Sequence, residues 1–133
     1  MKKRLSLKRT FLFITISFLA LLTILFSYSF LVIYTKVKIT CVNAQKEYKE
    51  DCVNSLTKLV QSDKKPFRQK NTAIWVLGQL ADQRALPILR SLYTGNMPSR
   101  ESLDKTISQY ELKKAIQWCE KGNITSWMYK DIK

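Results

Sequence analysis

The sequence contains no histidine among its 133 residues. This absence excludes Ser-His-Asp and Cys-His catalytic arrangements, and every metal site built on an imidazole ligand. The three cysteines are isolated from one another and lack CxxC spacing, so they do not indicate a zinc site. The three glycines are also far apart, which leaves no phosphate-binding loop. We therefore expect no catalytic residue, no metal, no cofactor and no small-molecule substrate.

Acidic residues are scarce as well. The chain has 10 Asp and Glu against 23 Lys and Arg, which gives a net charge of +13. An excess of this kind favours anionic lipid head groups as neighbours. The basic residues are dispersed, without a basic–aromatic ladder, so we do not expect nucleic acid as a partner. The alternative explanation is that the charge keeps a domain near the membrane soluble.

Charge, proline and glycine are all absent from residues 11–34, FLFITISFLALLTILFSYSFLVIY. These 24 residues would form about 36 Å of helix, and the hydrocarbon core of a bilayer is about 30 Å thick. The apolar region of a signal peptide is shorter, about 7–15 residues. A cleavage-like VNA sequence at 42–44 lies well beyond the apolar run. We expect an uncleaved transmembrane helix, with a removed signal as the alternative.

The basic residues on either side of this segment predict its orientation. Five lie in the tail 1–10, whereas Lys36 and Lys38 are the two that follow the apolar run closely. The positive-inside rule then places the tail in the cytoplasm and residues 35–133 on the outer, periplasmic or extracellular side. The sequence therefore predicts a single-pass protein of the cytoplasmic (inner) membrane. A juxtamembrane segment, 35–49, would lead from the anchor to the external domain.

An oxidising compartment would allow one pair among Cys41, Cys52 and Cys119 to form a disulfide. Cys41 and Cys52 are the candidate pair. On one straight helix they would lie about 16 Å apart, too far for a disulfide, but a bend between them would allow the bond. The alternative is three small apolar residues buried in helix contacts.

Beyond residue 50, apolar residues recur with a helical period in four stretches. We expect helices over 52–60, 67–81, 83–93 and about 103–122, with the tail 123–133 folded against the last of them. Pro66 is placed to open the second helix and Asp82 to cap the third. Gly78 would allow another backbone to approach closely. No stretch alternates with period two, so the predicted fold class is all-α.

Two of these stretches repeat. Cys52-Val53 with Leu56 overlays Ala85-Leu86 with Leu89 at an offset of 33 residues. KNTAIWVL at 70–77 overlays LKKAIQWC at 112–119 at an offset of 42, and the difference lies in the longer loop around 96–102. Residues 50–122 thus divide into two helix–turn–helix units, 50–82 and 83–122.

The stretch PFRQKNTAIWVLGQLADQRALPILRSL, residues 66–92, resembles the HEAT-like repeats of bacterial proteins, of the PBS-lyase type. In that family an Arg-containing helix ending in Ala-Leu-Gly precedes an acidic turn and an Ala-Leu/Ile-Pro-x-Leu helix. Val76 stands where the family usually has Ala. The positions that match are Arg68, Ala73, Leu77, Gly78, Asp82, Ala85, Pro87 and Leu89.

The resemblance implies a short HEAT-like α-solenoid of two antiparallel helix pairs over residues 50–122. It also implies a scaffold for protein–protein contact. A minority of the family are bilin lyases, for which two units leave little room. Because a solenoid normally needs about three repeats to bury its core, the ends of this array need to be covered by flanking segments or by a partner.

The candidate contacts with a partner are Trp75, Arg84, Arg90 and Trp127. Trp75 lies off the main apolar stripe of its helix, and exposed aromatic residues often anchor interfaces. The alternatives are core packing for the tryptophans and solvated surface for the arginines. The leading hypothesis is a membrane-anchored adaptor that binds another, membrane-associated protein and has no enzymatic activity. The alternative is a structural accessory subunit of a membrane complex, assembled through its transmembrane helix.

Overall fold

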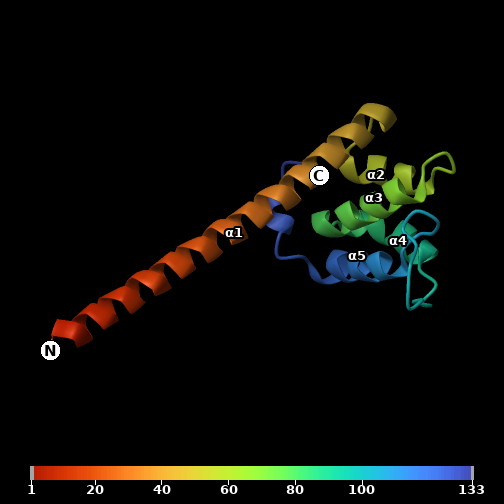
Figure 1. The fold of residues 1–133 in the computed structure, drawn as a ribbon. Helices are drawn as coiled ribbons and strands as arrows, with labels where there is room; N and C mark the ends of the chain where they lie inside the picture. Colours follow the sequence, from red (N-terminus) through yellow and green to blue (C-terminus); the bar gives the residue numbers. More distant parts are fainter. Residues whose placement is uncertain (1, 133) are drawn as a thin grey trace. The chain divides into compact units, whose positions relative to one another are not determined.

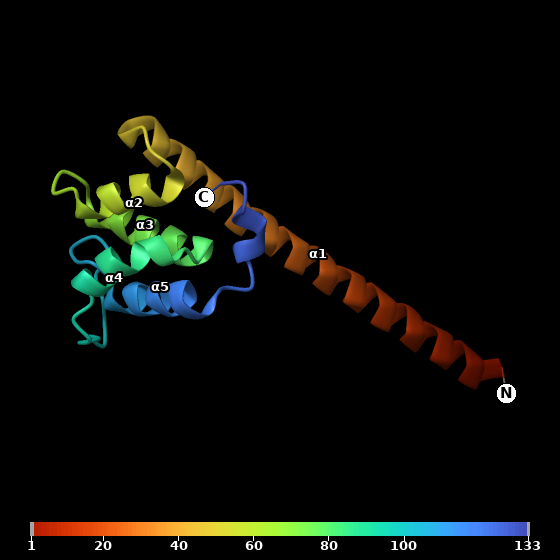
Figure 2. The ribbon, with the colours of Figure 1, turned by 180° about the vertical axis from the view of Figure 1, so that it is seen from behind.

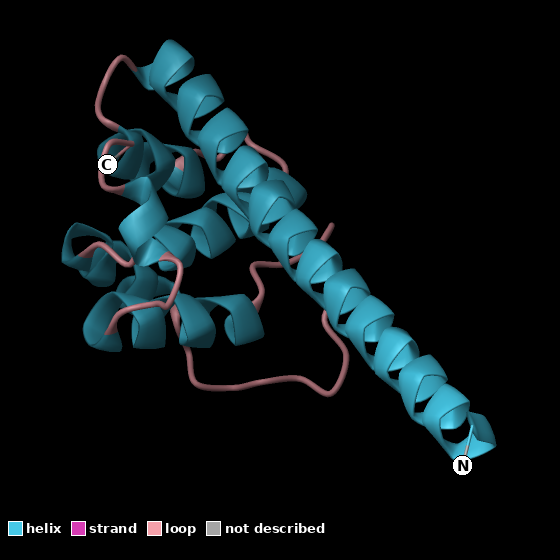
Figure 3. Ribbon diagram, turned by 90° about the vertical axis from the view of Figure 1, so that its left-hand side faces the viewer, coloured by secondary structure: helices cyan, strands magenta, loops and turns pink. Residues whose placement is uncertain are grey.

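The computed structural model describes residues 2–132 and contains only helices, turns and loops in that range (Figure 3). In chain order the helices are α1 (Lys2–Tyr48), α2 (Cys52–Gln61), α3 (Phe67–Leu80), the 3-10 helix η1 (Gln83–Ala85), α4 (Leu86–Leu92), α5 (Gln109–Lys121) and the 3-10 helix η2 (Ser126–Tyr129). The chain divides into two compact units, one ending at Thr35 and one beginning at Lys36. The all-α prediction is confirmed.

The first unit is the apolar part of α1. Its large hydrophobic side chains are exposed, among them Phe11 at 70 % and Phe26 at 67 %. Two threonines within the run bond to their own helix: Thr15 donates to the carbonyl oxygen of Leu12 at 2.8 Å, and Thr23 donates to that of Ala20 at 2.8 Å. By length and composition, this is the helix within the described residues that could cross a membrane.

The last part of α1, residues 36–48, belongs to the second unit. Although most of its residues are polar, Val37, Cys41 and Ala44 are at most 1 % exposed. Their spacing places them on one helical face, hidden in the sequence among lysines. The helix ends where Lys49 takes a positive φ of 59°. The juxtamembrane segment is therefore a core element.

The chain turns sharply after α1. Asp51 caps α2, since its carboxylate accepts from the backbone N–H groups of Val53 and Asn54 at 3.1 and 3.2 Å. This turn brings the Cα atoms of Cys41 and Cys52 to 5.0 Å, and the two residues form a disulfide. The bend required by the sequence-based argument thus lies at residues 49–51. Cys119 lies outside the disulfide and is buried, and its thiol donates to the carbonyl oxygen of Leu77 at 3.6 Å.

Helix α3 forms the centre of the second unit, packed between α2 and α5 (Figures 1 and 2). Pro66 is its N-cap, and Ala81 ends it in a left-handed conformation. The largest core side chains are less than 2 % exposed, among them Val53, Leu56, Ile74, Leu77, Leu80, Leu89 and Leu112. Gly78 lies against α5 at Ala115, as the predicted close approach requires.

Two predicted helices start differently in the structure. The third helix begins as a 3-10 turn capped by Asp82, and becomes α-helical only at Leu86, beside Pro87. The fourth begins at Gln109 instead of about 103, because Ser108 caps it there. Leu103 and Tyr110, apolar residues within the predicted range 103–122, are 48 % and 55 % exposed.

The C-terminal tail packs differently from the prediction. It forms η2 and contacts α3, whereas we expected it to fold against α5. Tyr129 is fully buried, and Thr125 donates to Gln79 on α3 at 2.9 Å. Tyr129 and Thr125 therefore hold η2 on α3. Neither residue belongs to a periodic pattern in the sequence.

Candidate functional site

A cavity of about 380 Å³ opens on one side of α3. Arg68, Asn71, Thr72 and Trp75 share this side because they are spaced by three or four residues along the helix. The remaining lining residues come from three other segments: Lys36 from the end of α1, Leu103 from the loop before α5, and Glu111 from α5. We call this space the Trp75 cavity. Trp75, predicted as a partner contact, is half-buried in its wall.

The loop that closes one side of the cavity is held by Asn71, which is 6 % exposed. The side-chain amide of Asn71 donates to the carbonyl oxygens of Leu103 and Thr106, both at 2.9 Å. Its side-chain oxygen accepts from the backbone N–H of Ser108 at 2.8 Å. One buried amide thus makes three hydrogen bonds to residues more than 30 positions away, and fixes the loop on α3.

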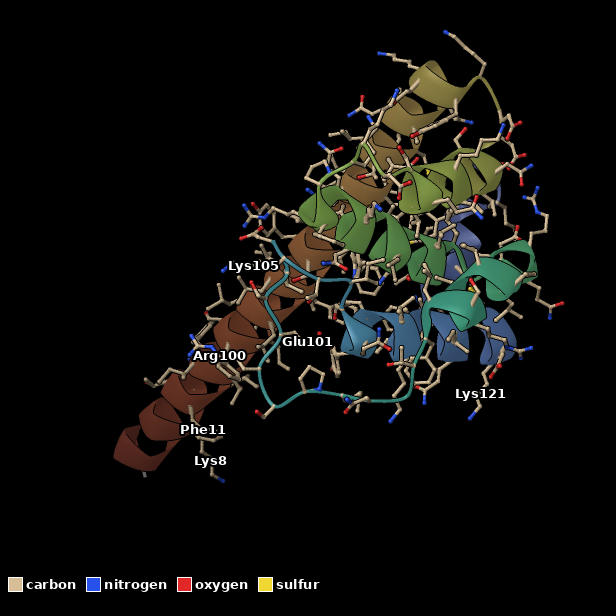
Figure 4. The ribbon with its side chains drawn as sticks, turned by 90° about the vertical axis from the view of Figure 1, so that its right-hand side faces the viewer. Lys8, Phe11, Arg100, Glu101, Lys105 and Lys121 are labelled. Carbon is tan, nitrogen blue, oxygen red and sulfur yellow. A yellow bond between two sulfur atoms is a disulfide. The ribbon has the colours of Figure 1, made fainter. Side chains whose placement is uncertain are left out.

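The start of α5 is capped twice. Ser108 accepts from the N–H of Glu111 at 3.1 Å. The carboxylate of Glu101 accepts from the N–H of Gln109 at 2.7 Å and from the hydroxyl of Ser108. A carboxylate at this position is stabilised by the helix dipole. Figure 4 shows Glu101 on the loop, beside the first turn of α5.

Glu111 has one satisfied and one unsatisfied oxygen. Oε1 lies 3.5 Å from the ammonium nitrogen of Lys114, whose charge also sits 5.0 Å from the ring centre of Trp118. Oε2 is buried and has no hydrogen-bond partner among the described residues. Sequence reasoning missed this group, although the Ser-x-x-Glu pattern at 108–111 was a signal that the glutamate would lie at a helix start.

A second groove, of about 690 Å³, shares Lys36, Arg68 and Thr72 with the cavity. Two ion pairs lie along it: Lys65 with Glu47 at 2.7 Å, and Arg68 with Asp104 at 3.6 Å. The hydrogen bond from Lys65 to Glu47 raises the pKa of Lys65 above its ordinary value of 10.5, against the opposing effect of desolvation. The groove is therefore lined by mixed charges.

Trp127, the second tryptophan named as a contact, lies away from this cavity on η2 and is 65 % exposed. Ile124, in the same turn region, is 85 % exposed. The turn itself is anchored by the buried Tyr129 and by Thr125, which donates to Gln79. The exposed side chain of Trp127 is therefore carried by a turn that is held in place by buried neighbours.

The two candidate arginines are exposed but engaged within the chain. Arg84 pairs with Asp82 at 3.1 Å and with Asp51 at 3.3 Å. The hydrogen bond to Asp82 is the main cause of the raised pKa of Arg84. Arg90 pairs with Glu120 at 2.6 Å. A carboxylate of a partner would have to compete with these ion pairs. The structure does not bring the four predicted contact residues together in one cavity.

Among the described residues, no group of three or more Asp, Glu or Cys side chains is arranged to hold a metal ion. The side chains that line the Trp75 cavity include one carboxylate, two cations and an indole. Comparisons with protein families, with curated proteins and with solved structures found no match. The HEAT-like resemblance therefore stays a prediction.

Proposed function

We propose that this chain is a single-pass, membrane-anchored module that binds another protein through its helical second unit. The apolar part of α1 supports the anchor, because its large side chains are exposed while the second unit has a core of its own. Hydrophobic surface exposed along a whole helix is stable in lipid but not in water.

The proposed domain is a short HEAT-like array. Helix α2 packs on α3, α4 packs on α5, and α3 packs on α5, which is the order of contacts expected of two stacked helix pairs. The array needs its ends covered. Val37, Cys41 and Ala44, on one face of residues 36–48, are buried. At the other end, η2 packs on α3 and Tyr129 is buried. These two flanking segments are the proposed covers for the ends of the array.

The observation that carries the binding proposal is the display of Trp127. An indole 65 % exposed on a turn fixed by buried neighbours costs little ordering entropy on binding. The test compares two alanine variants of exposed aromatic residues. Trp127→Ala should weaken the partner complex by roughly 2 kcal/mol, about thirtyfold, as for an interface anchor. Tyr110→Ala, at 55 % exposure on α5, is the matched control. Equal retention of the partner by both variants would refute the assignment of Trp127.

The alternative, a subunit assembled through its transmembrane helix, makes an opposite prediction. Replacing residues 11–34 with an unrelated apolar helix should leave the partner complex intact if the second unit binds the partner. Loss of the complex, with the protein still in the membrane, would favour the accessory subunit.

The outer location proposed for the second unit is supported by the disulfide between Cys41 and Cys52, since such bonds persist in oxidising compartments. Topology can be tested by thiol labelling of intact cells with an impermeant reagent. Cys119 is buried and unsuitable, so the exposed Lys113 is changed to cysteine. The Lys113→Cys variant should be labelled and the unchanged chain should not. Labelling that requires permeabilised cells would reverse the proposed orientation.

A further inference from the structure

The starting point is the groove of about 690 Å³, which lies between the end of α1 and the start of α3. All the residues that line it belong to the second unit. One side is formed by residues on a single face of α1, from Lys36 to Glu47, and the other by residues from Pro66 to Thr72. The α1 side is about 16 Å long, from the helical rise between Lys36 and Glu47. We call this space the α1–α3 groove.

A covalent bond and an ion pair hold the α1 side of the groove in place. Cys41, next to Thr40 on this side, is joined to Cys52 of α2 by the disulfide. Glu47, at the end of the same side, pairs with Lys65 at 2.7 Å. Because these links exist before any ligand binds, a ligand does not have to order the walls of the groove.

Two carboxamide side chains in the groove have no hydrogen-bond partner within the described part of the chain. Asn43 lies on the α1 side and Gln69 on the α3 side, and both are exposed. Thr40 and Thr72 beside them differ, since each donates to its own helix, at 2.8 and 2.9 Å. A carboxamide has donors and an acceptor, as a peptide backbone does. A free carboxamide on each side therefore suits a polypeptide that lies between them.

Such a polypeptide has to be extended. A helix bonds its own backbone N–H and C=O groups, so it has none to offer to Asn43 and Gln69. A helix that binds in a groove uses an apolar surface instead. Apart from Ala44, Leu59 and Pro66, the side chains that line this groove are polar or charged. An extended chain covers about 16 Å with about five residues.

One end of the groove attracts negative charge. Lys36 and Arg68 both line the end that the groove shares with the Trp75 cavity. The ammonium group of Lys36 has no ion pair among residues 2–132. The side chain of Arg68 is 81 % exposed, and its bond to Asp104 is long, 3.6 Å. An exposed pair of this kind contributes little, so a carboxylate of a partner competes well for the guanidinium, whose fork fits it.

We propose that the α1–α3 groove binds an extended segment of a partner protein that carries an acidic side chain. The carboxylate pairs with Lys36 and Arg68. Asn43 and Gln69 hydrogen-bond to the backbone of the segment. This inference rests on the proposed function, because it gives the chemistry of a second contact with the same partner. Trp127 does not line the groove, so the two contacts are separate.

The test selects peptides from a random library displayed on phage, with the full chain held in nanodiscs of phosphatidylcholine and with empty nanodiscs as the counter-selection. The enriched peptides should share an acidic residue. One of them, synthesised and titrated by fluorescence polarisation, should bind about tenfold more weakly to Lys36→Gln and to Gln69→Ala, the effect of one lost hydrogen bond. Lys46→Gln and Gln117→Ala are the matched controls, exposed and outside the groove, and should bind like the unchanged chain.

Replacing the acidic residue of the peptide with its amide tests the pairing directly. The neutral peptide should bind the unchanged chain about tenfold more weakly, and Lys36→Gln should weaken it little further, because the two changes remove the same interaction. All four substituted positions are exposed, so the variants should fold, and circular dichroism verifies this.

Two results would overturn the proposal. The first is equal weakening by Lys36→Gln and Lys46→Gln with Gln69→Ala unchanged, which is the behaviour of a general basic surface. The second is a selection that yields no peptide dependent on both Lys36 and Gln69. The proposed function fails separately, if exchange of residues 11–34 removes the partner while the peptide still binds. The groove fails alone if the partner complex depends on Trp127 but on neither Lys36 nor Gln69.

Discussion

A Cβ atom added at Gly78 would lie 2.9 Å from the Cα of Ala115, so α3 approaches α5 closely at this glycine. The nearest obstacle is backbone, with the ring of Trp118 at 3.0 Å behind it. Neither can move aside without shifting a helix. The contact between the two central helices therefore depends on the missing side chain of one residue.

Gly78→Ala should destabilise the second unit. In an exposed helix the change would gain about 1 kcal/mol of helix propensity, but here the added methyl group meets α5, and overpacking costs about 1–3 kcal/mol. We expect a net loss of up to about 2 kcal/mol, seen as a lower melting temperature by tryptophan fluorescence in detergent. Gly78→Ser should be worse. A stabilised alanine variant would show that α3 and α5 are not in close contact.

The Cys41–Cys52 disulfide should stabilise the second unit measurably. Its loop closes over a sequence separation of 11 residues. Loop-closure entropy for such a length corresponds to roughly 3 kcal/mol. The double variant Cys41→Ala/Cys52→Ala should melt at a lower temperature than the oxidised chain and should no longer respond to reductant. Cys119→Ala is the control for the response to reductant, since this cysteine is not part of the disulfide. An unchanged response to reductant in the double variant would contradict the pairing.

Asn71→Ala should release the loop before α5. The change removes three hydrogen bonds, at 2.8–2.9 Å, and leaves buried partners unsatisfied. We expect a loss of about 2–3 kcal/mol and faster tryptic cleavage after Arg100 and Lys105, which lie exposed on the loop in Figure 4. Thr72→Ala, whose hydroxyl bonds only within its own helix, is the control. Cleavage at equal rates in both variants would exclude a role for Asn71 in holding the loop.

The Lys65–Glu47 ion pair should make the stability of the folded chain depend on pH in the alkaline range. A pKa raised in the folded state means that folding favours the ammonium form of Lys65. The stabilisation is then fully present below the ordinary pKa of 10.5, and is lost as pH rises through the raised value. The difference in melting temperature between the unchanged chain and Lys65→Gln should be constant near neutral pH and shrink above 10.5.

Lys113→Gln controls for general alkaline unfolding, because the structure shows no ion pair for Lys113 among the residues it describes. A difference between the unchanged chain and Lys65→Gln that grows with pH would reverse the predicted sign.

Local signals in the sequence predicted part of this fold well. Pro66 and Asp82 lie at the helix starts assigned to them, and Gly78 makes the close contact that its lack of a side chain allows. These features are set by backbone sterics and by hydrogen bonds within a few residues, which a single sequence displays directly.

The failures have a common physical cause in tertiary contacts. The burial of Val37 and Tyr129 depends on segments distant in the chain, so neither residue could be placed from its neighbours. The late start of α5 depends on Asn71, which takes the N–H of Ser108 from 37 positions away. The same bond creates the unsatisfied oxygen of Glu111, so the candidate site was invisible for the same reason.

The turn between α1 and α2 also determines how the protein would respond to pulling. Tension entering from the anchor along α1 reaches Cys41 and crosses directly to Cys52 through the covalent bridge. Residues 42–51 then carry no load. After residues 36–41 of α1, the force passes to α2, which is pulled at its first residue, and residues 42–51 keep their shape until the bridge is reduced.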